Sequence, residues 1–154
     1  MIKKEIPDYR KKVYQLLDVK GEKFAYAVLK NKDKIETAFQ TYLDILQKYK
    51  PSEKYNEYDE KRVKLAEKFA KKDEKGEPII IGERYDVEDK EGFEKEWDVL
   101  KEEYKEALKE WDDELEKKNQ ELDEEIDIDF HIVSKVPDTI SARELEAAEF
   151  MIKK

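Results

Sequence analysis

The sequence predicts a mainly α protein of the α-rich α+β class. We expect a long antiparallel helical hairpin with a small β-hairpin at its tip, a short C-terminal strand and a closing helix. Apolar residues recur every three or four positions over two long stretches, and a run of isoleucines between them is followed by a glycine turn. A chain of 154 residues also favours one domain, residues 1–154, because single cores stop growing beyond about 250 residues.

The first part of the chain predicts two helical segments. A short N-terminal helix is expected within residues 1–21, with Pro7 near its start and Gly21 just past its end. The apolar rhythm then continues through residues 22–75, which form the first long arm. Pro51 lies inside this arm, and the sequence leaves open whether it kinks the helix or ends it.

A β-hairpin and a second arm follow. Residues 78–88 contain two short β-prone runs around Gly82-Glu83, and a glycine in the first turn position suits a type II′ turn. In residues 90–123, apolar residues that include Trp97 and Trp111 recur at nearly heptad spacing, and the other positions are mostly charged. A helix of this length cannot bury its stripe alone, so the first arm is its expected antiparallel partner.

Two shorter elements complete the prediction. Apolar and polar residues alternate over residues 126–133, which indicates a half-buried strand. Residues 141–152 form the C-terminal helix, and Ser141 followed three positions later by Glu144 is a capping box.

The composition argues against most enzyme chemistries. The chain has no Cys, so it cannot hold a disulfide or a thiolate metal site. Its 4 glycines are isolated and form no phosphate-binding loop, and no serine stands in a nucleophile elbow. No apolar run approaches the roughly 18 residues of a membrane span, and the N-terminus has no signal-peptide core. We therefore expect a soluble cytoplasmic protein that is not an enzyme and needs no cofactor.

The charge is divided unevenly along the chain. Residues 1–75 hold 20 Lys and Arg against 14 Asp and Glu, whereas residues 76–154 hold 12 against 27. The two parts can attract each other within one molecule or between two. The pI near 4.9 argues against direct nucleic-acid binding, and the basic residues of the first part are better explained as solvated helix faces.

Two surfaces are candidates for binding another protein. Residues 110–129 contain 11 acids and 2 lysines, and a rod lined with carboxylates can imitate the phosphates of a duplex. The simpler interpretation of such a run is a solvated helix end. The acidic candidates are Asp112, Asp113, Glu116, Glu121, Asp123 and Glu124, and the candidates at the hairpin tip are Ile80, Glu83 and Tyr85.

Two other constellations have simple structural explanations. Asp127, Asp129 and His131 share one face of the expected strand and offer hard-metal ligands, although alternation alone explains their spacing. Trp97 and Trp111 could stack on nucleic-acid bases, but they fall on the heptad stripe of an acidic helix, where core packing is expected.

Four blocks of the chain resemble an uncharacterised family of small proteins from tailed bacteriophages and prophages. In that family an amphipathic helix leads through a polar turn to a Phe-rich acidic helix and a closing motif of the Ser-x-x-Glu-Leu type. The resemblance covers most of the chain from about residue 22 onward and includes no catalytic signature. The blocks that carry it are residues 24–32, 58–62, 71–76 and 140–152.

The resemblance implies a viral origin and action in the host cytoplasm. Together with the charge pattern, it leads us to expect a non-catalytic phage accessory protein that binds a host or phage protein. Such a protein could act as an acidic inhibitor or nucleic-acid mimic directed at a host nuclease or defence complex. The alternative is a structural protein of virion assembly that acts by self-association, as a homo-oligomer.

Overall fold

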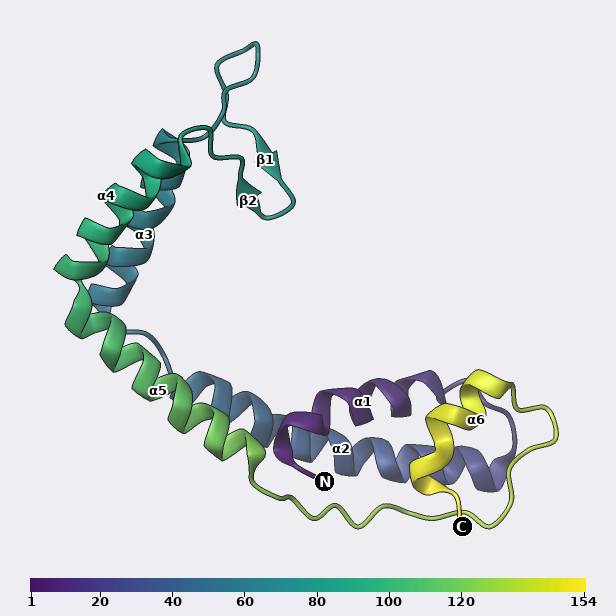
Figure 1. The fold of residues 1–154 in the computed structure, drawn as a ribbon. Coiled ribbons are helices and arrows are strands. Elements are labelled where there is room, and N and C mark those ends of the chain that lie inside the picture. The colour runs from purple at the N-terminus through teal and green to yellow at the C-terminus, as the bar shows by residue number, and fades with distance from the viewer. The chain divides into compact units, whose positions relative to one another are not determined.

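A computed structural model describes residues 1–154 (Figure 1). The chain is 64% helical, with six α-helices and one two-stranded antiparallel sheet, which confirms the α-rich α+β class. The elements in order are the 3-10 turn Lys3–Glu5, α1 (Ile6–Gln15), α2 (Glu22–Lys48), α3 (Glu53–Lys68), β1 (Ile80–Ile81), β2 (Arg84–Tyr85), α4 (Lys90–Glu103), α5 (Lys105–Asp123), α6 (Ala142–Ala148) and the 3-10 turn Glu149–Met151.

The chain divides into two compact units. The first comprises residues 1–49 and 117–154, and the second comprises residues 50–116. Helix α5 contributes residues to both. The prediction that residues 1–154 behave as one domain stays a prediction.

The first unit has the larger apolar core. Helix α1 packs on α2, and α6 packs on α1. The buried side chains come from these three helices and their connections; among them are Ile6, Val13, Leu16, Phe24, Val28, Ile35, Ala148 and Met151.

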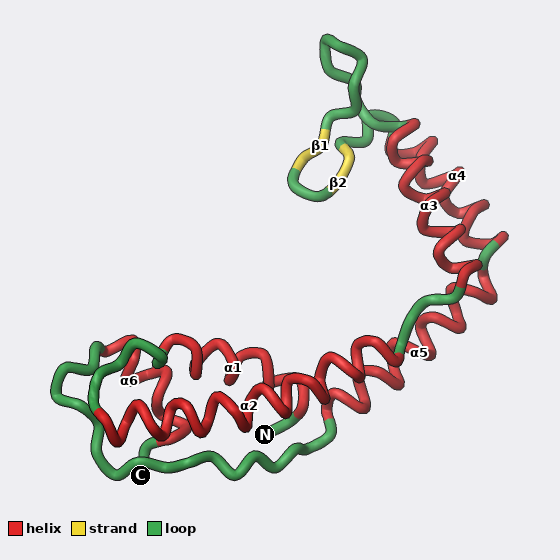
Figure 2. Tube along the Cα trace, turned by 180° about the vertical axis from the view of Figure 1, so that it is seen from behind, coloured by secondary structure: helices red, strands yellow, loops and turns green.

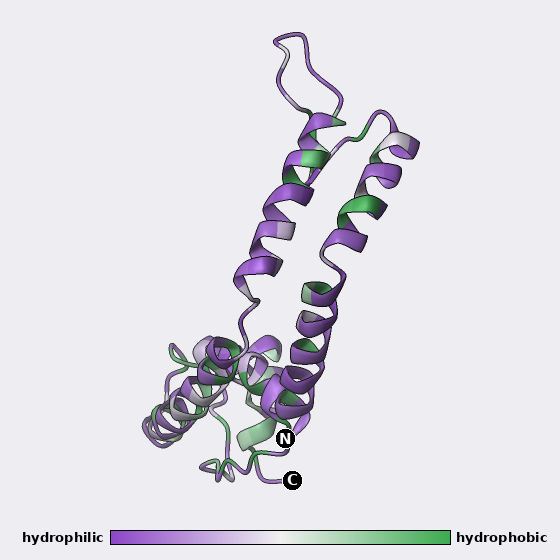
Figure 3. Cartoon of the chain, turned by 90° about the vertical axis from the view of Figure 1, so that its left-hand side faces the viewer, coloured by the Kyte–Doolittle hydropathy of each residue, from purple (hydrophilic) through white to green (hydrophobic).

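The second unit is a pair of helices with a hairpin at one end. Helix α3 packs against α4. Figure 3 shows that most residues of these two helices are hydrophilic and that hydrophobic residues occur only at a few positions along them. Its buried cluster is small and largely aromatic: Tyr58, Leu100 and Tyr104 form it, with Trp97 half-buried beside them. The Trp97 indole N–H donates to the Tyr58 hydroxyl at 2.9 Å. The stripe of the second arm therefore packs on α3, as its period predicts.

Pro51 ends the first helix rather than kinking it. Helix α2 ends at Lys48, Tyr49 is extended, and α3 begins at Glu53. The Ser52 side chain accepts a hydrogen bond from the Tyr55 N–H at 3.2 Å, so a new helix cap directly follows the proline.

The predicted element boundaries need further corrections. The N-terminal helix ends at Gln15, where the last turn tightens, so it is shorter than residues 1–21. The first arm ends at Lys68, because Ala70 and Lys72 form bridges with Val87 and Pro78 instead of continuing the helix. The second arm is interrupted at Tyr104, although the Tyr104 and Leu108 amides still donate four residues back.

The hairpin forms within the predicted residues 78–88. Ile80 pairs with Tyr85 and Ile81 with Arg84, which leaves Gly82-Glu83 as the turn. Gly82 has φ of +64°, and no residue other than glycine has positive φ, so the positive φ is confined to the first turn position, as a type II′ turn requires. At the C-terminal helix, Ser141 and Glu144 form the predicted capping box.

The predicted strand over residues 126–133 is wrong. Figure 2 shows the segment between α5 and α6 as loop, and within residues 126–133 only Val133 forms a bridge, with Ile152; just before them, Glu125 forms a bridge with Ile2. Ile126, Ile128 and Phe130 are half-buried as alternation predicts, but the pattern then shifts, since Ile132 is exposed and Val133 is buried. Alternation reports which side chains face the core. It does not supply a neighbouring strand.

The buried side chain of Asn31 in α2 takes the place of such a neighbour. Its Oδ1 accepts from the His131 N–H at 2.7 Å, and its Nδ2 donates to the His131 carbonyl at 3.0 Å. Asn31 is fully buried. One amide side chain therefore satisfies two backbone groups that a second strand would otherwise pair.

Ion pairs join the basic and the acidic parts of the chain within one molecule. Seven of them link residues 1–75 to residues 76–154, so the attraction expected from the charge distribution is satisfied at least in part inside each unit. The pairs are Lys3–Glu124, Lys4–Asp123, Lys34–Asp129, Lys48–Glu121, Lys61–Glu103, Lys68–Glu96 and Lys71–Asp86.

One of these pairs makes the stability of the first unit sensitive to acid. The Glu121 carboxylate accepts from Lys48 Nζ at 2.8 Å and from the Tyr49 hydroxyl at 2.6 Å. The Lys48 bond, followed by the Tyr49 bond, holds the pKa of Glu121 below its usual value. A carboxyl whose pKa is lowered by folding contributes its full stabilisation above its unfolded pKa, and this contribution is lost as pH falls through its lower folded-state pKa.

We therefore expect Glu121→Gln to lower the melting temperature at pH 7 and to have a smaller effect at pH 3, where more of the carboxyl is protonated. Thermal melts of the two proteins at both pH values measure this. Glu125→Gln is the control, because Glu125 is exposed and makes no ion pair. An equal effect of Glu121→Gln at both pH values would contradict the role assigned to the carboxylate.

Candidate protein-binding site

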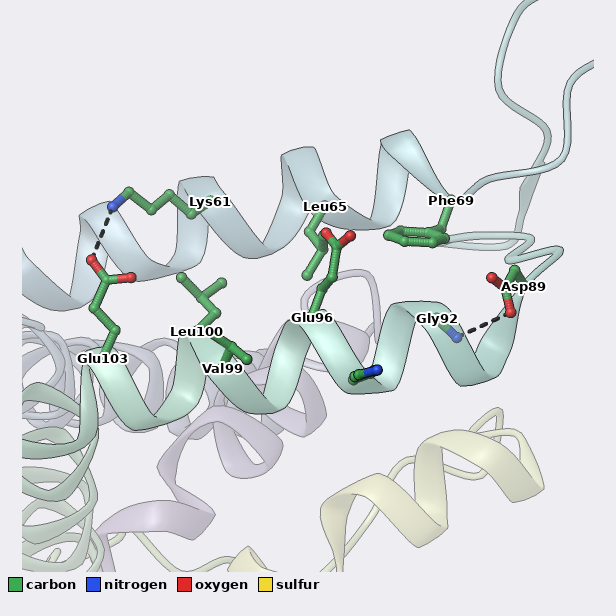
Figure 4. Close-up of a pocket in the computed structure, with 10 residues that line it drawn as sticks. Lys61, Leu65, Phe69, Asp89, Gly92, Glu96, Val99, Leu100 and Glu103 are labelled. Carbon is green, nitrogen blue, oxygen red and sulfur yellow. Dashed lines mark hydrogen bonds and ion pairs between the residues drawn. The ribbon is translucent and has the colours of Figure 1, made fainter.

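A groove of about 660 Å³ lies between α3 and α4 in the second unit. Leu65 and Phe69 project from α3 toward α4, and Val99 and Leu100 lie on α4 (Figure 4). Leu65, Phe69 and Leu100 are half-buried or buried, whereas Val99 is 68% exposed. The groove therefore offers an apolar floor and one aliphatic side chain that nothing in the chain covers.

Charged side chains border the groove. Lys61 Nζ lies 3.6 Å from a Glu103 carboxylate oxygen (Figure 4), and Lys68 Nζ lies 3.1 Å from Glu96, so two ion pairs run from α3 to α4. These four side chains are about half exposed or more, so each pair contributes little to stability. They can open to a partner at small cost.

The start of α4 closes one end of the groove. The Asp89 side chain accepts from the Gly92 N–H at 3.0 Å and caps the helix. A Cβ at position 92 would lie 2.2 Å from Asp89 Oδ2 and 3.0 Å from Phe69, so this close approach requires glycine.

The aromatic cluster sets the protonation states beside the groove. A hydrogen bond with Tyr104, helped by the charge of Glu103, raises the pKa of Lys61, and burial raises the pKa of Tyr55. Both shifts move away from neutrality, so Lys61 is charged and Tyr55 is neutral at pH 7.

The hairpin in the same unit carries the predicted tip residues. Ile80 is 60% exposed, Glu83 is exposed and Tyr85 is half-buried. Ile81, which the sequence did not single out, is 65% exposed. The hairpin therefore holds two uncovered isoleucines.

The six acidic candidates divide into two groups of three. Asp112, Asp113 and Glu116 belong to the second unit, are exposed and make no ion pair within the chain. Glu121, Asp123 and Glu124 belong to the first unit and pair with Lys48, Lys4 and Lys3. The second group already has partners inside the protein.

The structure does not gather Asp127, Asp129 and His131 into a metal site. No group of three or more His, Asp or Glu residues is arranged to hold a metal ion. Asp129 lies 3.6 Å from Lys34, and the His131 ring packs edge-on against Tyr26 at 5.7 Å between ring centroids. Trp97 and Trp111, the candidates for stacking on bases, contact residues of α3 instead. The Trp97 indole donates to the Tyr58 hydroxyl, and the Trp111 ring lies 5.6 Å from that of Tyr55.

Val99 was missed at the sequence level although a signal existed. It falls between Trp97 and Leu100 but off the stripe that they define, so an aliphatic side chain stands on a charged helix face. The role of Asn31 could not be predicted from the sequence, because a single asparagine in a helix does not indicate which backbone groups its side chain will bind.

Comparison of the chain with models of protein families, with curated proteins and with solved structures found no match. Within the structure, no helix combines the length and the apolar composition that crossing a membrane requires.

Proposed function

We propose that this chain is a non-catalytic accessory protein that binds another protein through residues 50–116. One observation carries the proposal: the three most exposed large hydrophobic side chains, Ile80, Ile81 and Val99, all belong to this unit. Ile80 and Ile81 are neighbours, and adjoining apolar side chains left uncovered on a surface are a feature of interaction sites. The phage origin and the action on a host protein rest on the sequence resemblance.

The exposed acids of the same unit favour a basic partner. Asp112, Asp113 and Glu116 have no cation of their own within the chain, so their field is available to steer association. An inhibitor that imitates nucleic acid uses this combination of carboxylates and apolar anchors. A host nuclease or defence complex is a partner of this kind.

Self-association in virion assembly is the alternative function. Its sequence argument was head-to-tail attraction between the basic and the acidic parts of the chain. Seven ion pairs now join these parts within one molecule, so the alternative needs a different surface.

The test uses the tagged protein to capture partners from bacterial lysate, with bound proteins identified by mass spectrometry. Each captured partner is purified, and its affinity is measured for the wild type and for Ile80→Ser/Ile81→Ser. We expect the double variant to weaken binding at least tenfold, because each isoleucine loses about 1.5 to 3 kcal/mol of burial. The matched control is Leu29→Ser/Leu145→Ser, which removes side chains that are 55% and 42% exposed in the first unit.

The acidic surface is tested by salt titration of the same complex. Reversal of Asp112, Asp113 and Glu116 to Lys should weaken binding at low salt and flatten its salt dependence. Reversal of Asp18, Asp127 and Asp138 changes net charge equally outside this unit and serves as control. If both triple variants behave alike, the acids act only through net charge; if neither isoleucine matters, the binding surface lies elsewhere.

A further inference from the structure

In the first unit, the backbone of residues 131–133 is hydrogen-bonded along one edge to other parts of the chain. His131 pairs with the Asn31 side chain. Two residues on, the Val133 N–H donates to the Met151 carbonyl at 2.8 Å, and its carbonyl accepts from the Lys153 N–H at 2.9 Å. In extended backbone, alternate residues direct their polar groups to the same side, so these four bonds define the inner edge.

The outer edge has no partner in the chain. The Ile132 N–H and C=O make no hydrogen bond, and its side chain is 50% exposed. The Phe130 carbonyl and the Ser134 N–H are also unpaired. A groove of about 570 Å³ lies between this segment and the start of α2; it is lined by residues 131–135 and by Glu22, Lys23 and Tyr26.

We infer that this edge binds the same edge of a second copy of the chain, in antiparallel register with Ile132 at the two-fold axis. In an antiparallel pair, two directly opposed residues can exchange both N–H···O bonds. Ile132 presents both groups on the outer side, so it is complementary to itself. The same register places the Ser134 N–H of one copy opposite the Phe130 carbonyl of the other, and brings the two Ile132 side chains together.

The charges at the ends of the edge favour the antiparallel arrangement. Asp129 precedes the edge, its carboxylate fully exposed and 3.6 Å from Lys34. Lys135 follows the edge, is exposed and makes no ion pair. With Ile132 on the axis, Asp129 of each copy lies at the same end of the paired edge as Lys135 of the other, whereas a parallel arrangement would bring like charges to the same end. Glu22 and Lys23, which also line the groove, offset each other.

The edge is short enough to close after one pairing. The Phe130 N–H turns back to the Ile128 carbonyl at 2.8 Å, the chain bends at Ser134, and Pro137 has no N–H to donate. Short edges that end in turns and proline do not propagate. A single two-fold contact therefore pairs all the free backbone groups of the edge and gives a dimer rather than a fibre. This surface is separate from the one in the proposed function; the dimer carries two copies of residues 50–116.

The test measures mass against concentration by analytical ultracentrifugation, together with amide hydrogen exchange of the full chain. We expect a reversible monomer–dimer equilibrium. The Ile132 amide should gain protection as concentration rises, while the His131 and Val133 amides, bonded within the chain, are protected at every concentration. Ile132→Pro removes the outward N–H, leaves the inner bonds in place and should weaken dimerisation about tenfold or more.

Charge reversal provides a matched set of variants. Asp129→Lys and Lys135→Asp should each weaken the dimer, and the double variant Asp129→Lys/Lys135→Asp should restore it, because the two charges exchange places across the axis. Asp127→Lys is the control within the same segment. A monomer at millimolar concentration overturns the inference and leaves the edge to water. The inference is also overturned if the dimer is unaffected by Ile132→Pro and by the charge reversals, or if the protein assembles beyond a dimer. If a different protein is found bound at this edge, that protein replaces the second copy as its occupant.

Discussion

Replacing Asn31 with Leu should destabilise the first unit by about 2 to 4 kcal/mol. Leu has nearly the same shape but leaves the N–H and C=O of His131 without partners, and each unsatisfied buried polar group costs about 1 to 3 kcal/mol. The Met151 sulfur, which accepts from Asn31 Nδ2 at 3.6 Å, also loses its donor. Urea unfolding followed by circular dichroism gives the change in free energy of unfolding.

The control for this substitution is Asn119→Leu, an exposed asparagine in the same unit, for which we expect less than about 0.5 kcal/mol. The His131 amide should also lose its protection from hydrogen exchange in the Asn31 variant. If stability and protection are both unchanged, the Asn31 side chain does not support this segment, and the inner edge has another origin.

Replacing Tyr58 with Ala should unfold the second unit selectively. Tyr58 is 5% exposed, its hydroxyl accepts from Trp97, and its ring lies 5.8 Å from that of Tyr55 and 6.0 Å from that of Tyr104. Loss of a buried aromatic side chain costs about 3 to 5 kcal/mol, a large share of the stability of a unit with so few buried residues. Hydrogen exchange should then show lost protection in α3 and α4, while α1, α2 and α6 stay protected.

Tyr58→Phe is the matched variant, since it keeps the ring and removes only the acceptor for Trp97. We expect it to cost about 1 kcal/mol. If Tyr58→Ala instead removes protection from all helices together, the chain unfolds as one domain over residues 1–154, and the two units are not independently stable.

Most of the helical architecture was predictable because it depends on local patterns. Ser141 and Glu144 specify a cap within four residues, and Gly82 specifies a turn by its freedom to adopt positive φ. The stripe from Trp97 to Tyr104 predicts which face of the second arm is buried. Each of these features acts over one or two turns of chain, so a single sequence contains the whole signal.

The binding candidates were predicted less completely. Of the tip candidates, Ile80 and Glu83 are exposed and Tyr85 is half-buried, and the exposed Val99 and Ile81 were missed. Glu121, Asp123 and Glu124 are engaged by lysines far away in the chain. Whether an acid is paired depends on which cation the fold brings within about 4 Å, and no local pattern reports that distance.

The sequence by itself determined the helices, the hairpin turn and the faces that turn inward, because propensity, capping and periodicity are properties of neighbouring residues. Only the tertiary structure decided that residues 126–133 lack a neighbouring strand. A strand needs a second chain segment to satisfy its amides, and here the side chain of Asn31, 100 residues away from His131, fills that place on one edge. On the other edge, the N–H and C=O of Ile132 have no partner for the same reason, because hydrogen-bond partners are assigned by the fold as a whole.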